Sequence, residues 1–336
     1  MTKNYEEIIL EVCGEDEYKE SLEACKHKQS HAKYVPLNNF AYNDHPFRHE
    51  RITEVARHYL PHVYNRKDVF DIVHVLYPLV VKVQASGKLC ESASGRVVHV
   101  ENSSISHRVG STGQDGVVLV MTAWHIGKYC RNKEIQLTCI LDYNDLNNVG
   151  KTMNVVNIYH YDEESDVCVL ECQAPDANTA DVLTKRVAAF DSLYYKLYDR
   201  MKQKKKTFHR WQTSEWTLST LVIIISHPHG GPKLISVGER VKRDPFGKKP
   251  VTSDLLYNYT ANTCLGCSGA PVLVFGAPTH SAVFVHRGKL KVDGTNCSSK
   301  AFKNILQVHI PFLGIYNLYD KTCISVSVNL SVSYLA

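Results

Sequence analysis

Short strand-like segments separated by turn residues run through the chain from about residue 76, and they constrain its fold more than any other feature. They are rich in Val, Ile and other strand-forming residues. Many short strands divided by turns are typical of a β-sandwich or a β-barrel. The segments are 78–84, 95–101, 116–122, 135–141, 153–161, 167–172, 220–226, 233–238, 255–261, 271–276, 281–287 and 304–316, with a last candidate at 326–335.

Residues 1–75 follow a different pattern, which predicts a helical extension with a partly disordered arm before Tyr34. Apolar residues recur at three- and four-residue spacing within 48–59 and 67–76, and this period predicts two helices. Residues 193–203, which lie between two groups of strand-like segments, also favour a helix.

Composition and charge exclude few classes of protein. The chain has 336 residues, of which 44% are hydrophobic and 22% charged, as in a globular protein with a sizeable core. The net charge of +5 does not by itself indicate nucleic-acid binding. Lysines cluster at 202–206 without interleaved aromatic residues, which favours a solvated loop over a nucleic-acid site.

The termini and apolar runs give no sign of secretion or of a membrane anchor. The first seven residues contain no apolar signal region, and the apolar run 221–225 is too short to span a bilayer. We therefore expect an intracellular protein, cytoplasmic or nuclear, without a membrane partner.

The eleven cysteines are expected to be reduced thiols, because no signal peptide is seen. Cys264 and Cys267 form a CxxC pair, but no second pair stands at the spacing of a zinc finger. We therefore expect small buried hydrophobic residues, with no metal and no cofactor. A zinc- or nucleic-acid-binding protein built on the CxxC pair and the lysines is an alternative hypothesis.

Residues Gly266–Pro271 place a serine, Ser268, between glycines within a region of strands. Glycine permits backbone conformations that a side chain forbids. Such a turn can expose the serine hydroxyl and direct backbone N–H groups into one pocket, as the oxyanion of an acyl transfer requires. A nucleophilic serine also needs a histidine base and a third group that orients the histidine.

Two residues are candidates for those partners. His125 follows the apolar segment 118–124, at the end of an expected strand. Asp166 opens the segment 166–170, where a half-buried carboxylate can accept a hydrogen bond from an imidazole. Asp162 is a weaker candidate, because no apolar strand follows it directly.

Three segments resemble motifs of the chymotrypsin-like serine peptidases. Thr122–His125 is similar to their Thr-Ala-Ala-His, Asp166–Leu170 to Asp-Ile-Ala-Leu-Leu, and Gly266–Pro271 to Gly-Asp-Ser-Gly-Gly-Pro. The order of His, Asp and Ser along the chain is that of this family. Residues 226–238 resemble a turn and strand of its HtrA-like, intracellular, trypsin-like members.

The resemblance implies an all-β fold of two antiparallel six-stranded barrels, the chymotrypsin-like double barrel. We expect the N-terminal extension over residues 1–75, the first barrel over 76–190, and the second barrel with the C-terminal strands over 191–336.

The resemblance also implies a serine endopeptidase whose partner is a polypeptide substrate. Ser268 would attack the scissile carbonyl, His125 would transfer the proton and Asp166 would orient His125. The N–H groups of Gly266 and Ser268 would hold the oxyanion. A catalytically inactive binding module with the same fold is an alternative.

The neighbours of the serine differ from the secreted members of the family. Cys267 stands where those enzymes carry the aspartate that pairs with a freed N-terminus, so we expect no switch of that type. Cys267 is itself a candidate nucleophile, as in viral cysteine peptidases of this fold, but Ser268 fills the nucleophile position in the motif.

The resemblance places Asn262, Leu265 and His286 at the substrate-binding pocket. Asn262 has no charge with which to bind Lys or Arg. The segment around His286 resembles the Gly-Ile-His-x-Gly of glutamyl endopeptidases and viral 3C-like peptidases, which implies a preference for Glu or Gln at P1. The alternative is that His286 points to solvent.

Overall fold

The computed structural model describes residues 8–14, 23, 25, 31–40, 66–88, 90–101, 116–207, 220–241, 257–275, 284–291 and 294–299. The helix expected at 48–59, the strands expected at 304–316 and 326–335, and the lysine side chains at 202–206 lie outside this description. No helix within it is long and apolar enough to cross a membrane.

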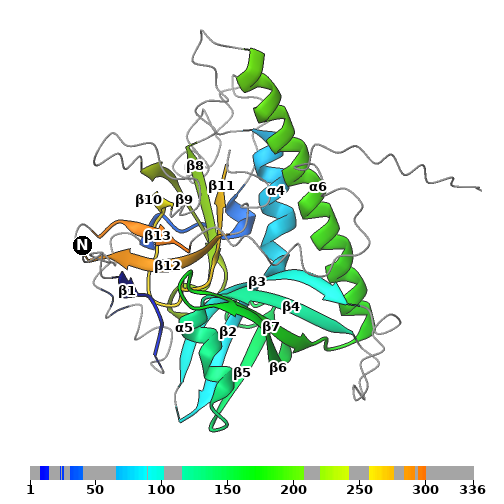
Figure 1. The fold of residues 1–336 in the computed structure, drawn as a ribbon, viewed down its shortest axis with the longest axis vertical. Coiled ribbons are helices and arrows are strands. Elements are labelled where there is room, and N and C mark those ends of the chain that lie inside the picture. Colours follow the sequence, from blue (N-terminus) through cyan, green and yellow to red (C-terminus); the bar gives the residue numbers. More distant parts are fainter. Residues whose placement is uncertain are drawn as a thin grey trace, which may run out of the picture. The chain divides into compact units, whose positions relative to one another are not determined.

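Six antiparallel strands form a first, closed barrel in the order β2-β3-β4-β7-β6-β5 (Figure 1). Alternate residues of β2 point into its core, where Val81, Val83 and Ala85 are buried. The strands are β2 (Val80–Gly87), β3 (Glu91–Glu101), β4 (Val117–Thr122), β5 (Ile135–Leu141), β6 (Lys151–Asp162) and β7 (Val167–Gln173).

Six further strands form the second barrel, in the order β12-β11-β8-β9-β10-β13. Because β12 pairs with both β11 and β13, this sheet closes on itself. The all-β double barrel expected from the sequence is therefore confirmed. The strands are β8 (Leu221–Ser226), β9 (Leu234–Val241), β10 (Asn258–Tyr259), β11 (Pro271–Val274), β12 (Phe284–Leu290) and β13 (Asn296–Ser298).

Part of the N-terminal extension joins this second sheet as a strand, which the sequence did not predict. Strand β1 (Ile8–Leu10) pairs antiparallel with β12, with Leu10 opposite Gly288, and dark-blue β1 lies beside orange β12 in Figure 1. Its partner is remote in sequence, so no local pattern marks this pairing. The extension also bridges both barrels at Cys13–Ser92 and Val35–Ile235.

Two longer helices accompany the barrels. The helix predicted at 67–76 is confirmed as α4 (Lys67–Leu76), and α6 (Ala177–Thr207) is longer than the helix predicted at 193–203. The carboxylate of Asp176 accepts a hydrogen bond from Thr179 N at 2.6 Å, which satisfies an otherwise unpaired N–H at the start of α6. The described residues also form short helical turns: η1 (Leu37–Asn39), η3 (Tyr77–Leu79), α5 (Trp124–Gly127), η4 (Lys128–Arg131) and η5 (Pro228–Gly230).

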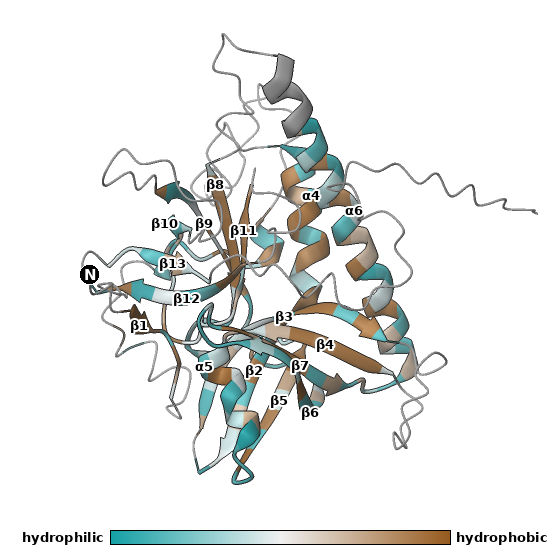
Figure 2. Cartoon of the chain, in the orientation of Figure 1, coloured by the Kyte–Doolittle hydropathy of each residue, from teal (hydrophilic) through white to brown (hydrophobic). Residues whose placement is uncertain are grey.

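Helix α6 packs against both barrels. The Arg96 guanidinium of β3 lies 4.1 Å from the ring centroid of Phe190, and Tyr194 Oη donates to Val274 O of β11 at 3.0 Å. Strands β4 and β8 are strongly apolar, as the brown colour along most of each shows in Figure 2. The helix therefore seals a core that both barrels share.

Replacing Phe190 by Ala should destabilise the protein, because it removes a buried ring from beneath Arg96. We expect the free energy of unfolding to fall by about 3–5 kcal/mol in a urea titration followed by circular dichroism. Ser192→Ala, on the exposed face of the same helix, is the control and should change little. Equal stability of the two variants would contradict this packing.

Candidate active site

The structure brings His125 and Asp166 together at the mouth of the first barrel. His125 Nδ1 lies 2.9 Å from Asp166 Oδ2, and the His125 backbone N–H donates to Asp166 Oδ1 at 3.0 Å. Strands β4 and β7 pair with Thr122 opposite Cys168, which aligns the end of one with the start of the other. Asp166 itself adopts a left-handed φ of 56°, an unusual conformation for a residue other than glycine.

This contact fixes the imidazole in one orientation. A carboxylate only accepts hydrogen bonds. Nδ1 of His125 therefore carries a hydrogen and donates a hydrogen bond to Asp166. Nε2 is then the ring nitrogen that can accept a proton from a nucleophile. It is buried, and no residue in the described ranges forms a hydrogen bond with it.

The Ser268 turn requires glycine at two positions. Gly266 has a φ of +87°, and a Cβ there would lie 2.5 Å from His227 O. Gly269 has a φ of +81°, and a Cβ there would lie 2.2 Å from Thr122 Oγ1. The turn therefore packs directly against the end of β4, the strand that leads into the candidate base.

Ser94, on β3 of the first barrel, holds this turn by both its main chain and its hydroxyl. Its Oγ donates to Gly266 O at 2.8 Å and accepts from His227 N at 2.9 Å. Its N–H donates to Ser268 O at 2.8 Å, and its carbonyl accepts from Thr122 Oγ1 at 2.7 Å. One buried residue thus links the serine turn to the strand that ends at the candidate base.

The carbonyl oxygen of Glu11 accepts hydrogen bonds from both N–H groups that were predicted to hold an oxyanion. Gly266 N donates to Glu11 O at 2.7 Å and Ser268 N at 3.3 Å. The Glu11 N–H also donates to Ser268 Oγ at 3.2 Å. A carbonyl oxygen of the chain itself therefore lies where the sequence predicts that an oxyanion is held.

The side chain of Glu11 lies in a buried, positively charged pocket. Its carboxylate contacts His286 Nε2 at 2.7 Å through one oxygen and Lys289 Nζ at 2.7 Å through the other. Burial alone would raise the pKa of the Glu11 carboxyl, but the hydrogen bond and charge of His286, with those of Lys289, outweigh burial and lower it to about 2.

The second ring nitrogen of His286, which does not face Glu11, is also held. His286 Nδ1 lies 2.6 Å from the hydroxyl of Tyr259, which in turn donates to Cys297 O at 3.3 Å. His286 is 0% exposed, so the alternative that it points to solvent is wrong.

A β-bulge explains why the sequence did not predict Lys289. Residues three apart on a regular strand face opposite sides of the sheet. Between His286 and Gly288 the register of β12 against β13 shifts by one residue, so His286 and Lys289 reach the same carboxylate. Gly288 gives β1 room to approach, since a Cβ there would lie 2.2 Å from Ile9 O.

The same strand reaches across to the first barrel. Arg287 Nε lies 3.5 Å from Asp166 Oδ2, which is an ion-pair distance rather than a hydrogen bond. Neither Arg287 nor Glu11 could be predicted from the sequence, because both contact partners that are distant in sequence.

The roles of Asn262 and Leu265 in the pocket stay predictions. The carbonyl of Asn262 accepts from Ser236 Oγ at 2.7 Å, and no contact joins Asn262 to the Glu11 carboxylate within the described residues. Leu265 is 40% exposed, and its carbonyl accepts from His229 N at 2.6 Å. Both predictions rely on register with the family, and the side chains that contact the Glu11 carboxylate come from β12.

Cys267 lies within the core of the turn. Its sulfur contacts Ser226 Oγ at 3.3 Å and accepts from the backbone N–H of Cys264 at 3.3 Å. Burial raises the pKa of the Cys267 thiol to about 12, so this group is not a thiolate at neutral pH. These contacts favour Ser268 over Cys267 as the candidate nucleophile.

Neither a family model nor a curated protein matches this sequence. Among solved structures, similarity is found to Deg5, at 12% identity and a TM-score of 0.39, over 70% of this chain and 88% of that chain. An inactive form of Rv3671c from M. tuberculosis H37Rv is 17% identical with a TM-score of 0.36, over 68% and 84%. At such scores, the strand pairing described above remains the basis for the fold.

Replacing Ser94 by Ala should loosen the turn around Ser268. The variant leaves the buried Gly266 carbonyl and His227 N–H without this hydroxyl, so we expect the free energy of unfolding to fall by about 1–3 kcal/mol in a urea titration. The control is Ser86→Ala, at a half-buried serine near the end of β2. An unchanged stability in Ser94→Ala would show that the hydroxyl does not hold the turn.

Proposed function

We propose that this protein is a serine endopeptidase that cleaves polypeptides after glutamate. One observation carries the proposal, namely the way Glu11 is held. Its carbonyl accepts from the N–H groups of Gly266 and Ser268, while its carboxylate lies between His286 and Lys289. A residue held by its main chain at such an N–H pair, and by its side chain in a specific pocket, is in the position of P1.

The neighbouring groups supply the chemistry of acyl transfer. Ser268 Oγ attacks the scissile carbonyl while its proton passes to Nε2 of His125, and Asp166 holds the ring and stabilises the imidazolium. The N–H pair stabilises the oxyanion. His125 then protonates the leaving amine, and water, activated by the same ring, hydrolyses the acyl-enzyme.

The pocket selects glutamate rather than glutamine. Lys289 Nζ and His286 Nε2 each meet a different oxygen of the Glu11 carboxylate, so both positions call for an acceptor. A glutamine side chain would present its NH₂ donor to one of them and leave that contact unsatisfied. Because these groups hold the carboxyl pKa at about 2, a glutamate in this pocket is ionised throughout the neutral range.

Peptides that differ only at P1 test this specificity. We expect kcat/KM for Glu to exceed that for Gln by about 30-fold or more, since truncating a buried charge pair costs about 2 kcal/mol or more. The full-length Glu11→Lys chain is the enzyme to use, because its own segment is repelled from the pocket. Adding Lys289→Met to the Glu11→Lys chain should lower the ratio of kcat/KM for Glu to kcat/KM for Gln.

Two results would count against the proposal. A preference for a basic or apolar P1 residue would exclude the glutamate pocket. The other result is that a fluorophosphonate probe labels Glu11→Lys no more than it labels Ser268→Ala. That result would exclude catalysis and favour the inactive binding module.

A further inference from the structure

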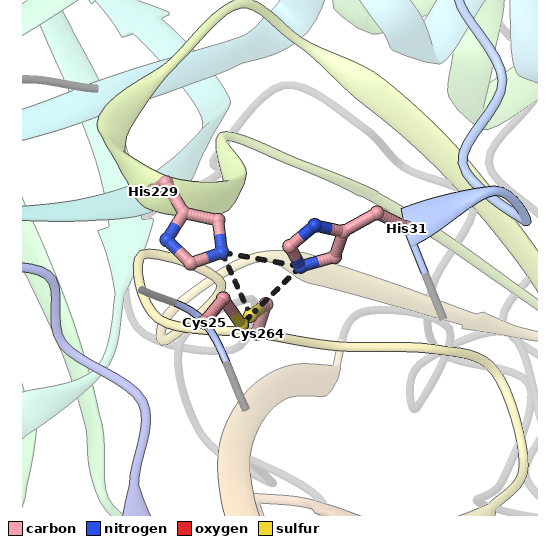
Figure 3. Close-up of side chains that lie close together, drawn as sticks. All are labelled: Cys25, His31, His229 and Cys264. Atoms are coloured by element: carbon pink, nitrogen blue, oxygen red, sulfur yellow. Dashed lines mark hydrogen bonds between the residues drawn. The ribbon is translucent and has the colours of Figure 1, made fainter. Parts of the chain in front are cut away.

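Two cysteines and two histidines from separate segments lie close together, as Figure 3 shows. Cys264 Sγ lies 2.9 Å from His229 Nε2, 3.5 Å from His31 Nε2 and 3.0 Å from Cys25 Sγ. The two Nε2 atoms are 3.3 Å apart. All four donor atoms lie within 4.8 Å of one another.

These separations approach those of a tetrahedral zinc site. Zn–N bonds of about 2.0–2.1 Å and Zn–S bonds of about 2.3 Å give donor–donor separations of roughly 3.3–3.8 Å. The distances from His31 Nε2 to Cys264 Sγ and to His229 Nε2 fall in this range. The shorter distances from Cys264 Sγ to Cys25 Sγ and to His229 Nε2 would reach it if the sulfurs moved by less than about 1 Å. The sulfurs are too far apart for a disulfide, whose S–S length is about 2.05 Å.

The backbone places two of these donors independently of any ion. His229 adopts a left-handed φ of 55° in η5, and its N–H donates to Leu265 O at 2.6 Å. Cys264 is the residue before Leu265, and its carbonyl accepts from Cys267 N at 3.0 Å. The η5 turn and the serine loop thus hold the buried His229 and Cys264 against each other.

The other two donors come from the N-terminal extension. The His31 carbonyl accepts from Tyr34 N at 3.1 Å, and the next residue, Val35, pairs with Ile235 of β9. These bonds bring the extension to the second barrel close to where His31 meets His229.

We propose that Cys25, His31, His229 and Cys264 bind a structural zinc ion. Two thiolates and two imidazoles are a donor set of structural zinc sites, and four protein donors leave no open position for a reactive water. The sequence does not predict this site, because no second pair of cysteines stands at zinc-finger spacing from the CxxC motif. Cys267 of that motif is not a donor, since its sulfur contacts Ser226 instead.

Metal analysis of the tag-free, full-length protein tests the proposal. We expect about one zinc per chain, and its loss in both Cys25→Ser and His31→Ala. Cys130→Ser, at a half-buried cysteine of the first barrel, is the matched control and should retain the metal. Cobalt(II) loaded in place of zinc should give the intense visible bands of tetrahedral sulfur–nitrogen coordination, and these should be absent in His31→Ala.

Several outcomes would overturn the site. They are a zinc content near zero that reconstitution does not raise, full retention of zinc by both ligand variants, or a Cys25–Cys264 disulfide in peptides mapped without reduction. If Cys25→Ser fails to fold, His31→Ala and the cobalt spectrum of the wild-type chain still decide the question.

A different observation concerns the chain around Glu11, which is held on both sides of one peptide bond. Before Glu11, β1 pairs with β12. After it, Cys13 and Ser92 exchange backbone hydrogen bonds of 3.1 and 2.8 Å. The Glu11–Val12 bond therefore crosses the Ser268 turn in an extended path, as a substrate does.

We infer that Ser268 of the same chain cleaves the Glu11–Val12 bond, an inference that rests on the proposed function. Ser268 Oγ bonds to the Glu11 carbonyl carbon, and its proton moves to His125. The bond to Val12 N breaks as that nitrogen takes the proton, and water then hydrolyses the ester. The products are a Glu11 carboxylate and a chain that begins at Val12.

Intact-mass analysis during incubation of the purified chain tests this step. We expect the wild type to convert to a chain beginning at Val12 at a rate independent of protein concentration. Ser268→Ala and Glu11→Lys should remain uncut. Glu23→Lys, at an exposed glutamate of the same extension, should be cut at Glu11 like the wild type.

The test separates this step from the proposed function. If Glu11→Lys cleaves glutamyl peptides while the wild-type Glu11–Val12 bond stays intact, self-cleavage is wrong and the peptidase assignment stands. If Ser268→Ala is cut at the same bond, a contaminating peptidase is responsible and the inference fails. If Glu11→Lys cleaves no peptide, the proposed function itself fails.

Discussion

The left-handed backbone of Gly266 and Gly269 is the constraint on which the rest of the site depends. It turns the N–H groups of Gly266 and Ser268 toward one point, where both meet the Glu11 carbonyl. Such a turn cannot persist alone in water, and Ser94 supplies its support from the other barrel. The site thus exists only when both barrels have closed and met.

Features that depend on neighbouring residues alone could be predicted from the sequence. The period of apolar residues predicted most of the strands and α4, since a strand or helix face must be buried whatever its partner. His125 and Asp166 could be predicted because each adjoins a recognisable strand, and the structure joins them at 2.9 Å. The glycines around Ser268 indicated a special turn for the same reason.

What the sequence could not predict involves partners that only the fold brings together. Glu11 and His286 are separated by 275 positions, and neither local sequence indicates that the two residues are in contact. The donors around Cys264 come from three separate parts of the chain. The role of Asn262, taken from register with the family, stays a prediction, whereas the structure shows that His286 and Lys289 contact the Glu11 carboxylate.

The bulge in β12 has a consequence for how such a pocket can change. One extra residue turns Lys289 to the side of His286. The charge of the pocket therefore depends on strand register as well as on which side chains are present. His286 and Lys289 stand three apart in sequence, so a register shift that removed the bulge would turn the two side chains to opposite faces of the strand. Selectivity in a protein of this kind can therefore be gained or lost by a change of strand register, with His286 and Lys289 both kept.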